Sequence, residues 1–246
     1  MQLTIKHPFL CLPVVSHPKD TRVLKLFDGE KLLLCVYFPF GEAAADNGTY
    51  SYEYLSPLPV SEWMGRTLTL SAEFPAGFED AVTQTDELPV SGEVHPAVHF
   101  TANAGWINDP NGLVYDNGTY HLYYQHNPFG VNWNNMSWGH ATSTDLLHWT
   151  RLPVAMLPDE EGTIFSGCGL TNEHRDEIQA AADSNSIEVF PRYALLFFYT
   201  AAGGSHDSAC SEGKDLHPAH GIQHRSWSHS AEASGSSCSV SQNRQP

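Results

Sequence analysis

Residues 106–112, which read WINDPNG, combine side chains that could do chemistry on a small polar substrate. Asp109 supplies a carboxylate between an amide and a proline, and Trp106 lies three residues before it. Proline disfavours helical backbone at the residue before it, so Asp109 is predicted to be extended. The Pro-Asn-Gly sequence that follows is typical of a turn and predicts a chain reversal directly after Asp109. A fixed carboxylate beside amides and an indole suits attack on the anomeric carbon of a sugar. Taken alone, such a motif is more simply an ordinary turn.

Further motifs accompany this block in a fixed order. They are HFT at 99–101, YHLYYQHNP at 120–128, Trp133, Met136, WGHA at 138–141, DLLHW at 145–149, LPVA at 152–155, Pro158-Asp159 and IFSG at 164–167. From about His99 to Gly169, and again at 195–202, the sequence resembles glycoside hydrolase family 32, the invertases, levanases and inulinases. Ile107 is a mild departure, because the family has methionine there. The resemblance implies a five-bladed β-propeller with its site at the central funnel.

The resemblance also implies the activity and the residues that carry it. The expected enzyme is a β-fructofuranosidase that hydrolyses terminal β-D-fructofuranosidic bonds of sucrose or of fructans such as inulin and levan. Asp109 matches the nucleophile of a retaining mechanism, which passes through a covalent fructosyl-enzyme. Other positions match substrate contacts: Asn108 and Gln125 as amides that hold fructose hydroxyls, Trp133 as an aromatic wall, and Phe165 and Ser166 as the pocket edge. For Trp133 and Phe165 taken alone, core packing is the simpler interpretation. The chemistry needs no metal and no cofactor.

Two carboxylates that this mechanism uses are not evident in the sequence. In the family, the acid comes from a Glu-Cys motif and a stabilising Asp comes from an Arg-Asp-Pro motif. Neither motif occurs here, and the nearest triplet to the second is Arg244-Gln245-Pro246. The acidic run 159–161 is interpreted as a solvated turn before Gly162, in which Asp159 gives structural support. Two hypotheses therefore stay open: a β-fructofuranosidase, or a catalytically inactive fragment or weak non-catalytic fructoside-binding remnant.

The first 90 residues predict a small β-sandwich that acts as an accessory domain. Two apolar runs at 23–27 and 31–36 flank Asp28-Gly29, which is a strong hairpin signal. Residues 67–74 alternate between apolar and polar side chains, as expected for a strand with one buried face. No catalytic group of residues is evident in this part. Residues 91–98 are predicted to form a linker.

Residues 99–204 are predicted to be the N-terminal part of the propeller. Strands on either side of Asn117-Gly118 form a second predicted hairpin, and further strands are expected at 137–143, 149–152 and 163–170. Four such strands make one blade, and 193–200 would belong to the next. Residues 205–246 are poor in apolar side chains and predict a disordered tail. Such a tail favours a frameshift or a truncation near residue 204. The predicted fold is thus all-β: a sandwich, one to two blades of a five-bladed propeller, and a tail.

Composition restricts the partners and the compartment. The formal net charge of −16 disfavours nucleic acid and anionic membranes as partners, whereas it is compatible with a neutral sugar. The sequence has no run of 18 apolar residues, so no membrane span is predicted. Residues 1–15 do not have the pattern of a secretion signal. The five cysteines show no pairing pattern and are expected to be buried free thiols. The expected location is therefore the cytoplasm, with secretion of a parent protein left open. The histidines at 217, 220 and 224 lie beside Pro218 and Gly221, which disfavours a helical metal site. Nothing in the sequence predicts an oligomeric state.

Overall fold

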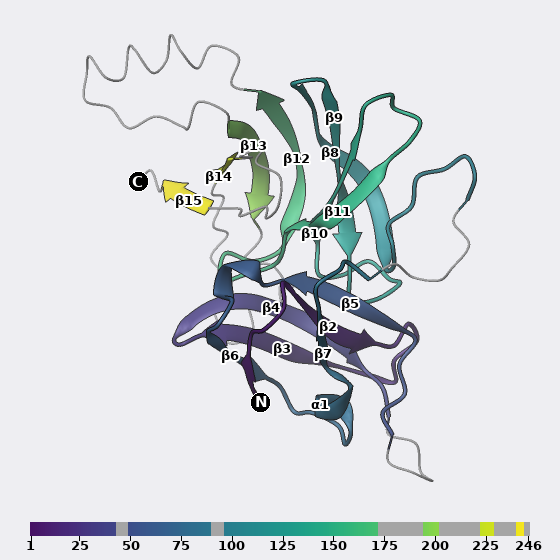
Figure 1. The fold of residues 1–246 in the computed structure, drawn as a ribbon, viewed down its shortest axis with the longest axis vertical. Coiled ribbons are helices and arrows are strands. Elements are labelled where there is room, and N and C mark those ends of the chain that lie inside the picture. Colours follow the sequence, from purple (N-terminus) through teal and green to yellow (C-terminus); the bar gives the residue numbers. More distant parts are fainter. Residues whose placement is uncertain (43–48, 90–95, 172–193, 202–221, 229–239, 244–246) are drawn as a thin grey trace.

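The computed structural model describes residues 1–42, 49–89, 96–171, 194–201, 222–228 and 240–243. The described part is built almost entirely of antiparallel β-strands, which confirms the predicted all-β class (Figure 1). Two short helical segments accompany them, the 3₁₀ turn η1 (Ser61–Trp63) and the one-turn helix α1 (Phe78–Ala81). None of the described helices is long and apolar enough to cross a membrane.

The N-terminal part is a sandwich of two antiparallel sheets. One sheet has the strand order β1-β6-β3-β4 and the other has the order β5-β2-β7. The strands are β1 (Gln2–Thr4), β2 (Phe9–Val14), β3 (Asp20–Asp28), β4 (Lys31–Phe40), β5 (Tyr54–Pro59), β6 (Thr67–Ser71) and β7 (Thr83–Thr85). Apolar side chains from both sheets form one buried core, in which Phe38, Phe40 and Phe78 are in mutual ring contact. The predicted β-sandwich is confirmed.

Two local predictions for the sandwich are also confirmed. Strands β3 and β4 pair as a hairpin, and Gly29 in the turn has a φ of 60°, in the left-handed region that glycine adopts without strain. On β6, Leu68 and Leu70 are fully buried, while Thr67 and Ser71 are exposed. The alternation in sequence therefore reports which face of the strand meets the core.

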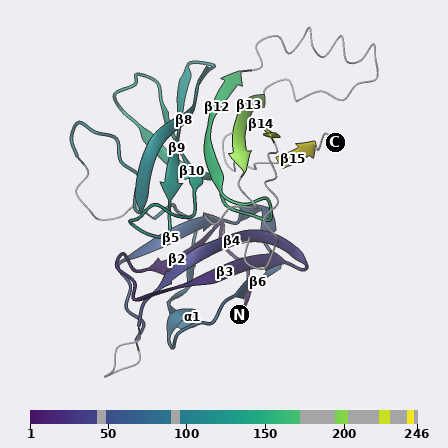
Figure 2. The same cartoon turned by 180° about the vertical axis from the view of Figure 1, so that it is seen from behind.

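The second part contains two four-stranded antiparallel sheets that lie above the sandwich in Figure 1 and in the reverse view of Figure 2. The first sheet has the order β11-β10-β9-β8 and the second has the order β12-β13-β14-β15. Their strands are β8 (Trp106–Asp116), β9 (Thr119–Asn127), β10 (Ser137–Ser143), β11 (Thr150–Met156), β12 (Ile164–Thr171), β13 (Ala194–Ala201), β14 (Ile222–Ser228) and β15 (Val240–Asn243). Each sheet corresponds to one propeller blade. The hairpin predicted at Asn117-Gly118 joins β8 to β9, and both turn residues have positive φ.

The two blades meet face to face across a core that includes Trp138, Tyr123 and Phe197. Strand β12 packs beside β8, and Gly169 on β12 permits the close approach, since a Cβ atom there would lie 2.7 Å from Val114 on β8. A Cβ atom added to Gly112 would lie 3.0 Å from both Phe197 and Trp138, and Gly112 also has a φ of 50°. The positive φ therefore favours glycine at this position, and a larger residue would also press against both aromatic rings.

The predicted chain reversal after Asp109 is wrong. Residues 106–116 form one continuous strand, β8, and the whole WINDPNG block lies inside it. The turn-forming residues act differently here: the pairing of β8 with β9 shifts register between Ile107 and Pro110 and again between Asn111 and Val114. Proline and glycine are common at such β-bulges, because a bulge needs neither a regular donor nor regular φ. The prediction of extended backbone at Asp109 is confirmed.

Residues 205–246 also differ from the prediction of a structureless tail, because β14 and β15 lie within them and continue the second sheet. The edge of β13 presents backbone N–H and C=O groups, and pairing with these groups does not require an apolar side-chain pattern. Residues 202–221, 229–239 and 244–246 lie outside the described residues, and so do Cys210 and Cys238.

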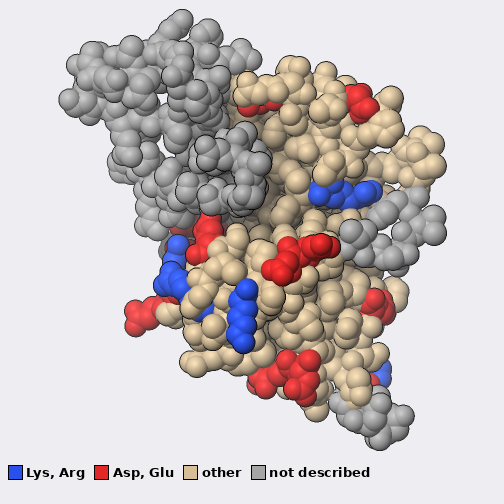
Figure 3. Space-filling model, viewed as in Figure 1, with Lys and Arg blue, Asp and Glu red and all other residues tan. Residues whose placement is uncertain are grey.

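The expectation of buried free thiols is only partly met. Cys11 is buried and free, and burial raises the pKa of its thiol. Cys168 on β12 is free but exposed, whereas Cys35 on β4 is disulfide-bonded. On the face drawn in Figure 3, the described Lys and Arg side chains form separate small patches among acidic ones.

Candidate functional site

Asp109 and Ser166 meet where β8 and β12 run side by side. Both side chains are exposed, and the Ser166 hydroxyl donates a hydrogen bond to Oδ2 of Asp109 at 3.1 Å. The two residues are far apart in sequence, so the contact depends on the packing of one blade against the next. Asn108 is also exposed, because the bulge at this point of β8 breaks the alternation that would turn one of two neighbours inward. The structure thus brings Asp109 and Ser166 into contact, and Asn108 is exposed beside Asp109 on β8.

Phe165, the residue before Ser166 on β12, forms an aromatic pair with Trp133. Their ring centroids are 6.4 Å apart with an interplanar angle of 29°. Trp133 lies in the loop between β9 and β10 and is 49% exposed, whereas Phe165 is half-buried on β12. Core packing therefore does not explain Trp133. Phe165 and Ser166 are consecutive on β12, so β12 carries one residue of the aromatic pair and one of the Asp109–Ser166 contact.

The backbone of β12 at this point is held by side chains of the first blade. Strand β12 has a register shift between Ile164 and Gly167, which leaves Phe165 and Ser166 outside the regular pairing. Gln125 donates from Nε2 to the Ile164 carbonyl at 3.0 Å, and Trp138 donates from Nε1 to the Phe165 carbonyl at 3.1 Å. The Gly167 N–H donates to Oδ1 of Asn111 at 3.3 Å. These three bonds fix the bulge that presents Phe165 and Ser166.

Gln125 therefore lies in a different environment from the one expected of a sugar-binding amide. Its side chain is only 3% exposed, and its amide nitrogen is committed to the backbone of β12. Its Oε1 atom and the Nδ2 atom of Asn111 are buried and have no hydrogen-bond partner among the residues that the structure describes. Within the described residues, a buried acceptor and a buried donor thus stay unpaired, and an unpaired buried polar group costs free energy. Asn111 and Trp138 were not predicted as site residues, although both lie in the recognised motifs.

The acidic run at 159–161 forms the turn that its sequence predicts. Asp159 is bridged to Gly162, and its Oδ1 accepts a hydrogen bond from the Glu161 N–H at 2.9 Å. The interpretation of Asp159 as structural support is consistent with this turn geometry.

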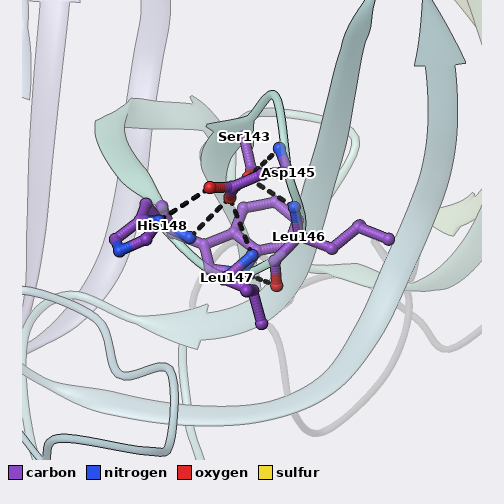
Figure 4. A network of polar contacts seen from close by, with 6 residues as sticks. Ser143, Asp145, Leu146, Leu147 and His148 are labelled. Atoms are coloured by element: carbon purple, nitrogen blue, oxygen red, sulfur yellow. Dashed lines mark hydrogen bonds and ion pairs between the residues drawn. The ribbon is translucent and has the colours of Figure 1, made fainter.

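A second polar cluster closes the hairpin between β10 and β11 (Figure 4). Asp145 accepts from the Ser143 hydroxyl at 3.1 Å, from the Leu147 and His148 N–H groups at 2.9 and 2.8 Å, and is 2.7 Å from His148 Nδ1. The carboxylate therefore lies between the hydroxyl and the imidazole. A nucleophilic serine needs the imidazole in that middle position to accept its proton, so the cluster is a turn and not a catalytic triad.

This cluster predicts a pH effect that can be measured. The hydrogen bond and charge of Asp145 raise the pKa of His148, and the His148 contacts in turn hold the pKa of Asp145 well below its usual range. The stabilisation by His148 is fully present below the pKa of unfolded histidine and is lost as pH rises through the raised pKa. We expect an NMR titration to place the His148 pKa above about 6.5 and the Asp145→Asn substitution to lower it. If His148 had the same pKa in the unaltered chain and in Asp145→Asn, the Asp145 carboxylate would not be the cause of the raised pKa.

No group of three or more His, Cys, Asp or Glu residues among the described ranges is arranged to hold a metal ion. Of the histidines considered in the tail, His217 and His220 lie outside the described residues.

Comparison with known proteins now places this site in a family. Residues 99–217 match the family described as the glycosyl hydrolases family 32 N-terminal domain. This part of the chain belongs to glycosyl hydrolase family 32. The family 32 region contains all six predicted site residues, and the resemblance drawn from the sequence motifs is confirmed.

Similar family 32 proteins include a levanase of Bacillus subtilis, 48% identical over 108 residues, which is 44% of this chain and 15% of the levanase. An extracellular exo-inulinase of Aspergillus niger is 63% identical over 79 residues, covering 30% of this chain and 15% of the inulinase. Among solved structures, an exo-inulinase from Aspergillus awamori has 39% identity and a TM-score of 0.35, covering 42% of this chain and 20% of that chain. The chain thus spans less than a fifth of the length of these two curated relatives.

Proposed function

We propose that the surface formed by β8 and β12 binds a terminal β-D-fructofuranosyl unit of sucrose or of a fructan, and that Asp109 attacks its anomeric carbon. The observation that carries the proposal is the exposed Asp109 carboxylate, which is hydrogen-bonded to Ser166, the residue after the Phe165 that pairs with Trp133. The names of the similar proteins, levanase and exo-inulinase, support this substrate class.

The geometry suggests how Asp109 acts as a nucleophile. The Ser166 hydroxyl binds Oδ2 and so orients the carboxylate, which leaves Oδ1 to form the bond to the sugar. Asn108 lies next to Asp109 on β8 and offers an amide for a fructose hydroxyl. The aromatic pair offers an apolar surface for the C–H face of the ring. In a retaining mechanism the leaving oxygen departs and water later releases the fructosyl group from Asp109.

Each of these steps also needs a second carboxyl group, about 5–5.5 Å from the nucleophile, as acid and then as base. The 246-residue sequence contains no Glu-Cys motif of the kind that supplies this acid in the family. A site that has a nucleophile and aromatic side chains but lacks this motif favours a second candidate function. In that case the chain binds fructosides and hydrolyses them at trace rates at most.

Removing the aromatic wall should weaken sugar binding. We expect Trp133→Ala to raise the dissociation constant for 1-kestose, measured by isothermal titration calorimetry, by about 3–10-fold, because an aromatic contact contributes about 0.5–1.5 kcal/mol beyond its buried area. Tyr52→Ala is the matched control, since Tyr52 is comparably exposed at 42% but lies in the sandwich. Equal affinities of the Trp133→Ala protein and the unaltered chain would argue against this surface as the sugar site.

A further inference from the structure

The loop that carries Trp133, residues 128–136, is anchored in the N-terminal sandwich. Phe129 is 1% exposed and belongs to the sandwich core, where its ring centroid lies 5.8 Å from that of Phe38 on β4. The Tyr54 hydroxyl on β5 donates to the Pro128 carbonyl at 3.2 Å. Figures 1 and 2 both show β4 and β5 on the side of the sandwich nearest to the blades. The first half of the loop is thus built into the other domain.

Asn135 makes a second anchor at the end of the loop. Its Oδ1 accepts from the Tyr37 N–H and its Nδ2 donates to the Tyr37 carbonyl, both at 2.8 Å, so one carboxamide pairs with the backbone of β4 as a neighbouring strand would. Nδ2 also donates to Oδ1 of Asn127 at 3.3 Å, and that oxygen accepts from the Phe129 N–H at 3.0 Å. Asn135 has a φ of 46°, which asparagine tolerates better than most residues. The two anchors are therefore linked to each other.

The loop is also joined to both strands of the candidate site. The Trp106 N–H on β8 donates to the Gly130 carbonyl at 2.9 Å, and the Ile164 N–H on β12 donates to the Met136 carbonyl at 2.7 Å. Trp133 is the residue that projects from this loop to Phe165. A loop without such anchors would populate many conformations, and a ring on it would face its ligand only part of the time.

We propose that the N-terminal sandwich is a positioning element of the sugar site, acting through Phe129 and Asn135 to hold Trp133 against Phe165. The inference deepens the proposed function and rests on it for the identity of the ligand. The sandwich is then more than an accessory module, because a change in its contact with residues 128–136 alters the wall of the site. Phe129 and Asn135 are positioning residues, and neither is expected to touch the sugar.

The test labels the full 246-residue chain with 5-fluorotryptophan and follows Trp133 by ¹⁹F NMR, with its signal assigned by its loss in Trp133→Phe. Asn135→Asp keeps an acceptor for the Tyr37 N–H but removes both donations from Nδ2. Phe129→Leu is a second, milder change to the other anchor. In both variants we expect the ligand-free Trp133 signal to move toward that of free 5-fluorotryptophan. If Trp133 then spends about a tenth of the time in place, the dissociation constant for fructose rises about tenfold.

Leu68→Ala separates positioning from general stability. Leu68 is fully buried in the same core but lies on β6, two strands away from β4 in the sheet, and makes none of the anchoring hydrogen bonds. Below its unfolding transition it should leave the Trp133 signal in place. The inference would be overturned if Leu68→Ala shifted the Trp133 signal as much as Asn135→Asp does. It would also be overturned if neither Asn135→Asp nor Phe129→Leu shifted that signal. If the anchors shift Trp133 as expected but fructose perturbs no signal of the unaltered chain, the inference stands and the proposed function fails.

Discussion

Sucrose and inulin are expected to be hydrolysed by the 246-residue chain at rates about 10²–10⁴-fold below those of a glycosidase with both carboxyls in place, since a positioned general acid contributes about that factor. The sequence contains an Asp109 that is suited to act as nucleophile but no Glu-Cys motif to protonate the leaving oxygen. The measurement is reducing-sugar release by the purified chain at ordinary enzyme concentrations.

A matched control makes this result interpretable. Asp109→Asn keeps the shape of the side chain but cannot act as the nucleophile, so any trace rate that belongs to this site should disappear. Hydrolysis at ordinary glycosidase rates that Asp109→Asn abolishes would show that another residue of the chain supplies the acid.

Trp138→Ala should have the largest effect on stability, with a loss of about 3–5 kcal/mol in the free energy of unfolding, as expected for a buried Trp-to-Ala change. Trp138 is 0% exposed and contacts the rings of Tyr123, Phe197 and Tyr199 between the two blades. Its Nε1 also donates to the Phe165 carbonyl, so the substitution removes one of the bonds that hold the β12 bulge. Urea denaturation monitored by circular dichroism measures the change.

Trp133→Ala is the control for this prediction, because it removes the same side chain from a position that is 49% exposed. We expect it to change the free energy of unfolding much less than Trp138→Ala does. Similar losses in the two variants would mean that the blade interface does not depend on the Trp138 contacts described here.

The strands were predictable where the sequence alternates or carries a strong turn signal. Asn117-Gly118 and Asp28-Gly29 place hairpins because few other residues adopt positive φ without strain. Strand β10 was expected at 137–143 and lies there. In these segments the conformational preferences of the residues agree with the fold, so the sequence of the segment alone predicts its structure.

The WINDPNG block was misread because its meaning depends on a partner strand. Proline, asparagine and glycine usually indicate a turn. Here β9 pairs with the segment and β12 packs beside it, so these residues form β-bulges within a strand. Strands β14 and β15 were missed for a related reason, since an open strand edge can recruit a segment with no apolar pattern.

The family motifs identified the surface of the site but not the residues that support it. Asp109 contacts Ser166 and Trp133 contacts Phe165, while their roles in binding or catalysis stay predictions. The burial of Gln125 and the attachment of residues 128–136 to β4 could not be predicted, because both depend on contacts between segments far apart in sequence.

The proposed role of Asp109 as a fructosyl-accepting nucleophile can be tested with β-D-fructofuranosyl fluoride. Fluoride leaves without protonation, so the bond from the Asp109 carboxylate to the anomeric carbon can form while the carbon–fluorine bond breaks, even without a general acid. Because no acid or base then assists attack by water, the covalent fructosyl-enzyme should accumulate. Mass spectrometry of the intact chain and of its peptides is expected to find one fructosyl group, attached to Asp109 and absent in Asp109→Asn. A fructosyl group on any other residue, or one that persists in Asp109→Asn, would show that Asp109 is not the nucleophile.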